Sequence, residues 1–201
     1  MVSKLIFSCE CSPLDKHTYN IRAYLQRTRM HLVTSTIFLP SITAYLSPAS
    51  QNALLRAYLG SSLIWWVTRG LPSLDIPGFF SSVFSSPPHN APKNPPDDST
   101  LPSPTSIHAL TPNPWLPIIQ TTVVHPGEHL CKIQRAFAHF AVLYGSRAPG
   151  QADFKDTELE GADKLDGTLF VRAAAATAKR MGWLREGEKV GQWDRDGFYY
   201  A

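Results

Sequence analysis

Ten of the 17 prolines of this 201-residue chain lie between Pro87 and Pro117, where they alternate with serine, asparagine, aspartate and threonine. Such a composition cannot bury enough apolar surface to offset the entropy lost when the backbone is ordered. We therefore expect a long flexible Pro/Ser-rich loop over residues 83–112. The ordered parts of the chain must fold on either side of it.

Upstream of this loop, apolar residues recur at three- and four-residue steps, which indicates helices. The pattern covers residues 15–45, and Pro40 should break or kink it because proline lacks an amide hydrogen. Ser47 followed by Pro48 predicts the start of another helix, since serine caps helices and proline fits the first helical position. This helix should continue to Arg69.

Downstream of the loop, residues 113–124 are expected to form a short extended segment. Helices are predicted over residues 126–144 and 168–181, each ended by a glycine. Neither a period-two strand pattern nor an internal repeat occurs. The predicted fold class is therefore all-α, a single irregular helical region over residues 1–201 that resembles a fragment of a larger helical fold.

Composition excludes several classes of protein. The hydrophobic fraction of 43% and the charged fraction of 17% are typical of globular chains. A net charge of +3, without a basic run, argues against nucleic-acid binding. The most apolar segment, residues 54–67, is too interrupted to span a membrane. Cys9, Cys11 and Cys131 form no disulfide framework, so a reducing, cytoplasmic location is expected.

Two enzyme signatures are absent from the sequence. No G-x-G-x-x-G glycine pattern follows a predicted strand, so a self-contained dinucleotide site is improbable. The G-x-S-x-G elbow of serine hydrolases is also missing. Neither class of enzyme is favoured.

The helix predicted from residue 126 has two neighbouring stripes. One is apolar and should be buried: Leu130, Ile133, Phe137, Phe140, Ala141 and Tyr144. The second borders it with three imidazoles and an amine: His125, His129, Lys132, Ala136 and His139. The outer side should hold Gln134, Arg135 and Ala138. Imidazoles one turn apart can converge on a transition-metal ion, although such a row also fits hydrogen-bonded or exposed histidines.

Lysine binds a metal only after its neutral amine has reacted with carbon dioxide to form a carbamate, which offers carboxylate-like oxygens. Burial next to a cation would favour that neutral amine. His139 lies roughly 20 Å along the helix axis from His125. It cannot share an ion with His125, so a structural role is expected for it.

Three blocks of the sequence resemble the questin oxidase-like family of fungal aromatic polyketide metabolism. The first is MHLVTSTIFLPSITAYLSPASQNALLRAYLGSSLIWWVTRGLPSLDIPGFF, residues 30–80. The second is NPWLPIIQTTVVHPGEHLCKIQRAFAHFAVLYG, residues 113–145, with the family's histidine–lysine–Arg-Ala helix. The third, residues 158–200, is similar to the family's C-terminal signature.

The resemblance implies an all-helical oxidoreductase that acts on anthraquinone-type polyketides with molecular oxygen. Members are described as Baeyer–Villiger-type oxidases, and some are similar to non-haem iron dioxygenases that use histidines and a carboxylated lysine. Carried over by motif, the metal ligands are His31, His129 and Lys132, with His125 as a weaker candidate. An aromatic substrate would pack against Trp65, Trp66, Phe79, Phe80 and Trp115.

The chain resembles only the C-terminal half of the family, whose members are about twice as long and contribute further histidines from the other half. Two alternatives to a complete, active enzyme therefore stay open. The chain is an incomplete oxidase, or it is a non-catalytic helical remnant that binds an aromatic ligand or a partner protein. An oligomer or a partner would then cover the missing half. The resemblance also links the chain to NADPH as a cofactor, but the sequence contains no NADPH-binding motif.

Overall fold

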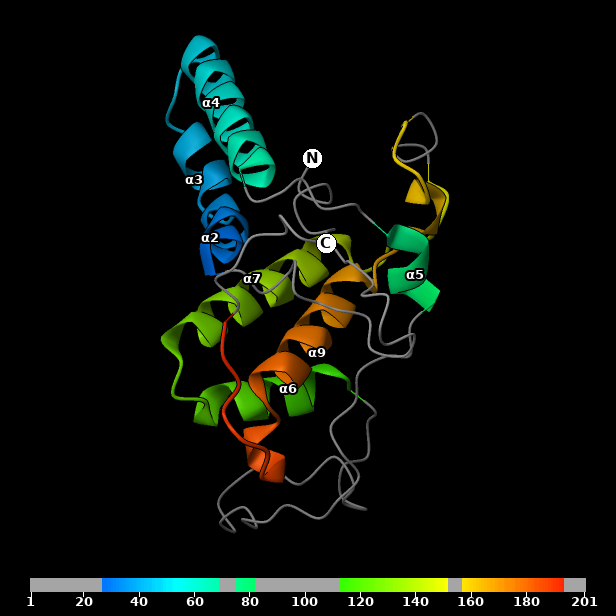
Figure 1. Ribbon diagram of the computed structural model, residues 1–201. Helices are drawn as coiled ribbons and strands as arrows, with labels where there is room; N and C mark the ends of the chain where they lie inside the picture. Colours follow the sequence, from blue (N-terminus) through cyan, green and yellow to red (C-terminus); the bar gives the residue numbers. More distant parts are fainter. Residues whose placement is uncertain (1–26, 69–74, 82–112, 152–156, 194–201) are drawn as a thin grey trace. The chain divides into compact units, whose positions relative to one another are not determined.

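The computed structural model describes residues 27–68, 75–81, 113–151 and 157–193. These residues form seven α-helices and two short 3-10 helices, and none of them lies in a strand (Figure 1). The all-α prediction is confirmed. The loop predicted over residues 83–112 and the start of the first predicted helix lie outside the described residues.

The chain divides into two compact units. Unit 1 comprises Met1–Ser82, Pro149–Leu165 and Asp194–Ala201, and unit 2 comprises Val83–Ala148 and Asp166–Trp193. The chain therefore passes from unit 2 into unit 1 at Pro149 and returns to unit 2 at Asp166. That the whole chain acts as one region stays a prediction.

Unit 1 begins with α2 (Arg27–Thr36), α3 (Leu39–Thr43) and α4 (Pro48–Val67). The predicted break is confirmed, but it precedes the proline that was expected to cause it. Pro40 lies in the first turn of α3, where the amide hydrogens have no intrahelical acceptor, so the missing one is not needed.

The start of α4 follows the prediction. The Ser47 hydroxyl accepts a hydrogen bond from the Ser50 amide at 3.3 Å, which satisfies one of the first amides of the helix. Gln51 donates through Nε2 to the carbonyls of Thr43 and Leu46 at 2.9 and 3.0 Å. The turn between α3 and α4 is thus closed by a side chain of α4 itself.

Tyr58 joins the middle of α4 to α2. Its hydroxyl lies 2.8 Å from the Ser35 hydroxyl and donates to the Leu32 carbonyl. Burial raises the pKa of Tyr58, although its hydrogen bonds to Ser35 and Thr36 act in the opposite direction. One turn later Ser62 is buried on the same face. The contact between α4 and the preceding helices is therefore partly polar.

Unit 1 also contains α5 (Ile76–Ser81), which packs against the short helix η2 (Ala162–Lys164). Gly161 precedes η2 with a φ of 74°, in the left-handed region that favours glycine. A Cβ atom there would lie 2.5 Å from Cδ of Pro77. Glycine therefore permits both the turn and the close approach of α5.

Unit 2 is built from α6 (Trp115–Val124), α7 (Glu128–Tyr144) and α9 (Leu169–Met181), followed by the short helix η3 (Leu184–Glu186). Helix α9 packs against both α7 and α6, and η3 packs against α6 (Figure 1). The core between them combines large side chains on α7 with both small and large ones on α9: Leu130, Ile133, Phe137, Phe140, Phe170, Ala173, Ala174, Ala178 and Met181.

The extended segment predicted over residues 113–124 is wrong, because residues 115–124 form α6. Pro117 lies in the first turn of α6, where helices tolerate proline. Ile118, Thr121 and Thr122 are buried at helical spacing. Packing of this face therefore overrides the strand preference of a segment rich in β-branched residues.

The helix predictions over residues 126–144 and 168–181 are confirmed by α7 and α9. On α7, Gln134 was expected on the outer side but is buried, and its Nε2 donates to the Ala174 carbonyl at 2.9 Å. The sequence of α7 alone does not show how many of its residues α9 covers. None of the described helices is both long enough and apolar enough to cross a bilayer.

Replacing Tyr58 with Phe should lower the free energy of unfolding by about 1–2 kcal/mol, because the half-buried Leu32 carbonyl and Ser35 hydroxyl each lose one hydrogen-bond partner. Urea denaturation measures the change. Tyr45→Phe is the matched control, since Tyr45 is 91% exposed. Equal effects of the two substitutions would contradict the role given to Tyr58.

Replacing Ala174 with Leu should destabilise the protein by about 1–3 kcal/mol, because α7 leaves no room for the larger side chain on the buried face of α9. Thermal unfolding checks this expectation. Ala148→Leu, at an exposed position of the same unit, should leave the melting temperature nearly unchanged. A tolerated leucine at position 174 would mean that the two helices are less tightly packed.

Candidate functional site

A three-residue corner, His125–Gly127, joins α6 to α7, and His125 holds it in place. The His125 Nδ1 accepts a hydrogen bond from the Gly127 amide at 2.9 Å, and its Nε2 lies 3.2 Å from the Met181 carbonyl. Because Nδ1 is an acceptor, the ring hydrogen is assigned to Nε2, which donates to the carbonyl. Both ring nitrogens are thus engaged within the protein. His125, the weaker candidate ligand, fits a structural role.

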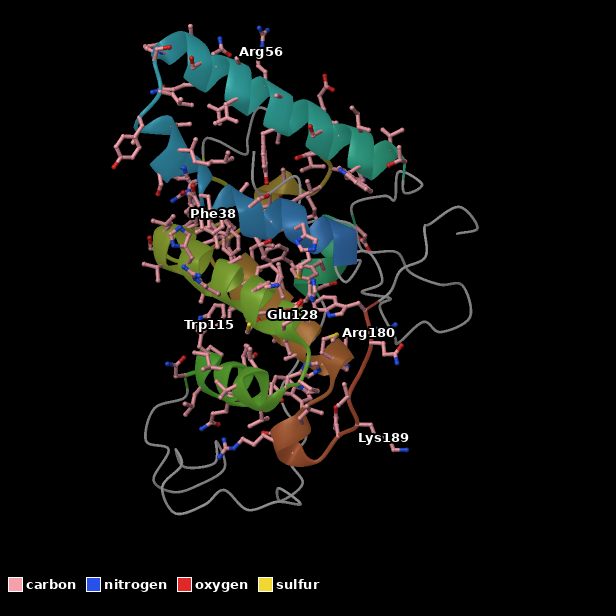
Figure 2. The ribbon with its side chains drawn as sticks, turned by 90° about the vertical axis from the view of Figure 1, so that its left-hand side faces the viewer. Phe38, Arg56, Trp115, Glu128, Arg180 and Lys189 are labelled. Atoms are coloured by element: carbon pink, nitrogen blue, oxygen red, sulfur yellow. The ribbon has the colours of Figure 1, made fainter. Side chains whose placement is uncertain are left out.

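The first turn of α7 brings a carboxylate, an imidazole and an amine together. Oε1 of Glu128 lies 3.3 Å from Nδ1 of His129 and 3.5 Å from Nζ of Lys132. His129 is buried, whereas the side chains of Lys132 and Glu128 are 48% and 71% exposed. Figure 2 shows Glu128 at the start of α7. We call these three residues the α7 cluster.

Glu128 was not among the residues predicted from the sequence, although a signal for it exists. Glutamate four residues before lysine on a helix is a stabilising spacing, and a carboxylate in the first turn complements the helix dipole. A carboxylate on one imidazole nitrogen fixes the orientation of the ring. With Nδ1 of His129 facing Glu128, the ring would bind an ion through Nε2.

The carboxylate has a second consequence for Lys132. A carbamate on Nζ would be an anion beside the anionic Glu128, and like charges at this distance repel each other. Carbamate formation therefore requires Glu128 to rotate away. The exposure of its side chain leaves room for that rotation.

His31 lies on α2 in unit 1, where it is exposed and its carbonyl accepts a hydrogen bond from the Ser35 hydroxyl at 2.6 Å. His129 and Lys132 belong to unit 2. The structure thus brings His129 and Lys132 together, and the convergence of His31 with them stays a prediction. Within the described ranges, no three His, Cys, Asp or Glu side chains are grouped so that they could hold a metal.

The third histidine of the predicted stripe, His139, is exposed near the end of α7. Its ring meets Phe140 edge-on at a centroid distance of 5.3 Å. The structural role expected for His139 stays a prediction. The exposure of its side chain makes His139 a suitable control for the buried histidines of the same segment.

The aromatic side chains proposed as substrate walls lie on three helices. Trp65 and Trp66 are near the end of α4, and Phe79 and Phe80 on α5 meet edge to face at 5.5 Å. Trp115 begins α6 in the other unit. A shared aromatic pocket of these residues stays a prediction.

His125→Ala should lower the free energy of unfolding by about 1–3 kcal/mol, because the Gly127 amide loses its partner and the Met181 carbonyl keeps only the hydrogen bond from the Gly191 amide. Chemical denaturation measures the loss. His139→Ala is the matched control and should change stability by less than about 0.5 kcal/mol, as exposed substitutions usually do. The structural role of His125 fails if both variants behave alike.

A comparison with protein families gives a match. The family model described as Questin oxidase-like matches residues 27–137, which is more than half of the chain and includes His31, His129 and Lys132. The match ends within α7, so the resemblance of residues 158–200 lies outside it. No curated protein and no solved structure shows significant similarity to the chain. The chain belongs to the questin oxidase-like family.

Proposed function

We propose that this protein is an oxidoreductase that uses molecular oxygen to oxidise aromatic polyketides of the anthraquinone type. Membership of the questin oxidase-like family supports the reaction class and the kind of substrate. The observation that carries the proposal is the α7 cluster, in which a buried imidazole is held by a carboxylate within the matched segment. Carboxylate-oriented imidazoles are the common form of histidine metal ligands.

The proposed resident metal is non-haem iron, held by His31, His129 and Lys132. His129 fits this role because Glu128 fixes its ring through Nδ1. Lys132 would take part as a carbamate: its neutral amine forms the Nζ–carbon bond to carbon dioxide, one proton leaves, and the Glu128 carboxylate turns away from Nζ while it keeps its contact with Nδ1 of His129. When bound, iron would supply the open coordination position at which oxygen is activated.

A second candidate function is a non-catalytic helical remnant that binds an aromatic ligand or a protein partner. The observation in its favour is the surface of α4, where Leu63, Ile64, Trp65 and Val67 are all exposed. Contiguous apolar surface of this kind marks interaction sites. The two functions differ in whether the purified protein binds iron.

Iron titration of the purified protein under anaerobic conditions tests the first function. Wild-type protein should bind iron, and His129→Ala should bind it at least tenfold more weakly. Glu128→Gln should weaken binding by about 10–100-fold, the usual effect of losing a residue that orients a ligand. Oxygen uptake with an anthraquinone substrate gives the second readout.

His139→Ala is the control, since it removes an exposed imidazole of α7 and should leave iron binding unchanged. Circular dichroism of each variant verifies that the helices are intact. Wild-type protein that binds no iron would refute the proposed oxidase and support the remnant. Equal iron binding by wild type and His129→Ala would remove the α7 cluster from the site.

A further inference from the structure

Residues 182–191, which follow α9, fold back along the end of that helix. The Gly191 amide donates to the Met181 carbonyl at 2.7 Å, and the Glu188 amide donates to the Trp183 carbonyl at 3.2 Å. The Glu188 carboxylate accepts in turn from the Trp183 amide at 3.0 Å. The far part of the segment is thus bonded to its start and to α9. We call residues 182–191 the strap.

Two glycines let the strap lie directly on the backbone of α9. A Cβ atom at Gly191 would lie 2.1 Å from the Arg180 carbonyl oxygen, and one at Gly182 would lie 2.2 Å from the Lys189 carbonyl oxygen. Gly182 also has a φ of 92°, a backbone conformation that favours glycine. Figure 2 labels Arg180 and Lys189, one on each side of this contact. A larger residue at either glycine would prevent the strap from closing.

The strap is also fastened to α6. The Leu184 amide donates to the Thr121 hydroxyl at 2.8 Å, and this hydroxyl donates to the Gly182 carbonyl at 3.4 Å. Trp183 between them is 1% exposed, and the short helix η3 within the strap packs against α6. The closed strap therefore clamps the end of α9 to α6.

The Met181 carbonyl connects the strap with the corner before α7. It accepts a hydrogen bond from the Gly191 amide of the strap and another from Nε2 of His125. His125 holds the Gly127 amide through Nδ1. An open strap would leave the Met181 carbonyl with fewer partners and α6 without its clamp. The corner would then be held less firmly.

Glu186 on η3 opposes the closed strap when it is ionised. Oε2 of its carboxylate is buried and has no hydrogen-bond partner within the part of the chain that the structure describes. An ionised oxygen in such a place loses its hydration without compensation. Burial accordingly raises the pKa of Glu186, although its own amide and Arg185 act in the opposite direction, and Glu188 adds to the rise.

The charges that act on Glu186 come from the strap itself, namely from Arg185 and Glu188. Helix α6, against which η3 packs, has no ionisable side chain. The remaining charged residues of this part of unit 2 have exposed side chains: Lys179 and Arg180 in the last turn of α9, and Lys189 on the strap. Protonation of Glu186 is therefore a local event of the strap.

We propose that the strap is a pH-dependent clasp, which closes on α6 and α9 when Glu186 is protonated and loosens when Glu186 is ionised, so that pH sets how firmly the corner before α7 is held. In the open strap water solvates both carboxylate oxygens, and ionisation favours that state. This inference does not depend on the proposed oxidase chemistry, since a protein without iron satisfies it.

The direction of the pH dependence follows from the burial of Glu186. Its pKa is higher in the closed strap than its ordinary value of 4.5, which applies to the open strap. The closed strap therefore gains stability as the pH falls from neutral. This gain is fully present below pH 4.5 and is lost as the pH rises through the raised pKa.

Amide hydrogen exchange of the full chain, followed by NMR at the Leu184 and Gly191 amides, tests the proposal. Their protection factors, corrected for the intrinsic effect of pH on exchange, should be roughly fivefold or more larger at about pH 5 than at about pH 7.5, the effect of one buried unpaired acceptor. Glu186→Gln should lose this rise and be the better protected of the two proteins at the higher pH, because it carries no charge there.

Glu160→Gln is the matched control, since it removes the charge of an exposed glutamate in the other unit. It should keep the rise of the wild type. Equal protection of the wild-type strap at both pH values, or a rise that survives in Glu186→Gln, would overturn the proposal.

Gly191→Ala tests the coupling to the corner without changing a charge. The added Cβ atom collides with the Arg180 carbonyl oxygen, so the strap should stay open. Protection of the Gly127 amide should then fall about twofold to tenfold, as expected when a hydrogen-bonded contact is weakened. Gly60→Ala is the control, because a Cβ atom there meets no described residue within 4 Å. Unchanged protection of Gly127 in Gly191→Ala would refute the coupling.

Discussion

The close contact of α7 with α9 is the constraint on which unit 2 depends. Alanines on α9 face large apolar side chains on α7. Because alanine is small, the two helix backbones can approach each other, and the alanines occupy the space between the large side chains. The hydrogen bond from Gln134 to the Ala174 carbonyl fixes the register of this contact. A larger side chain in place of Ala174 would push α7 and α9 apart at this point.

The corner before α7 connects the packing of α7 on α9 with the candidate site. His125 reaches the last residue of α9 through the Met181 carbonyl and the first turn of α7 through the Gly127 amide. The direction in which α7 starts is therefore set by α9. Glu128, His129 and Lys132 follow directly, so their positions depend on His125.

Much of the fold could be predicted from local signals. Ser47 and Pro48 start α4, and the apolar spacing of α7 and α9 gave both helices with nearly correct ends. Helix α6 was missed because its β-branched residues favour strands, and only burial against other helices decides the outcome. The burial of Gln134 was missed for the same reason: one helix does not reveal how much of it a neighbour covers.

The candidate site was predictable in part. His129 and Lys132 were found from spacing and family resemblance, and the structure adds the carboxylate between them. Glu128 was overlooked because a solvated i to i+4 pair is ordinary on helices. Its importance comes from the contact with a buried imidazole, which spacing alone cannot show.

The interleaving of the two units has a consequence for how the protein can be divided. A cut after Ala148 would remove α9 and leave the apolar face of α7 in water. Yet the two ends of the excursion through Pro149–Leu165 are adjacent, since the Gly167 amide donates to the Arg147 carbonyl at 2.8 Å. A whole segment can be inserted or deleted when its two ends lie next to each other. A short artificial bridge across this gap would turn unit 2 into a continuous, separately expressible helical module.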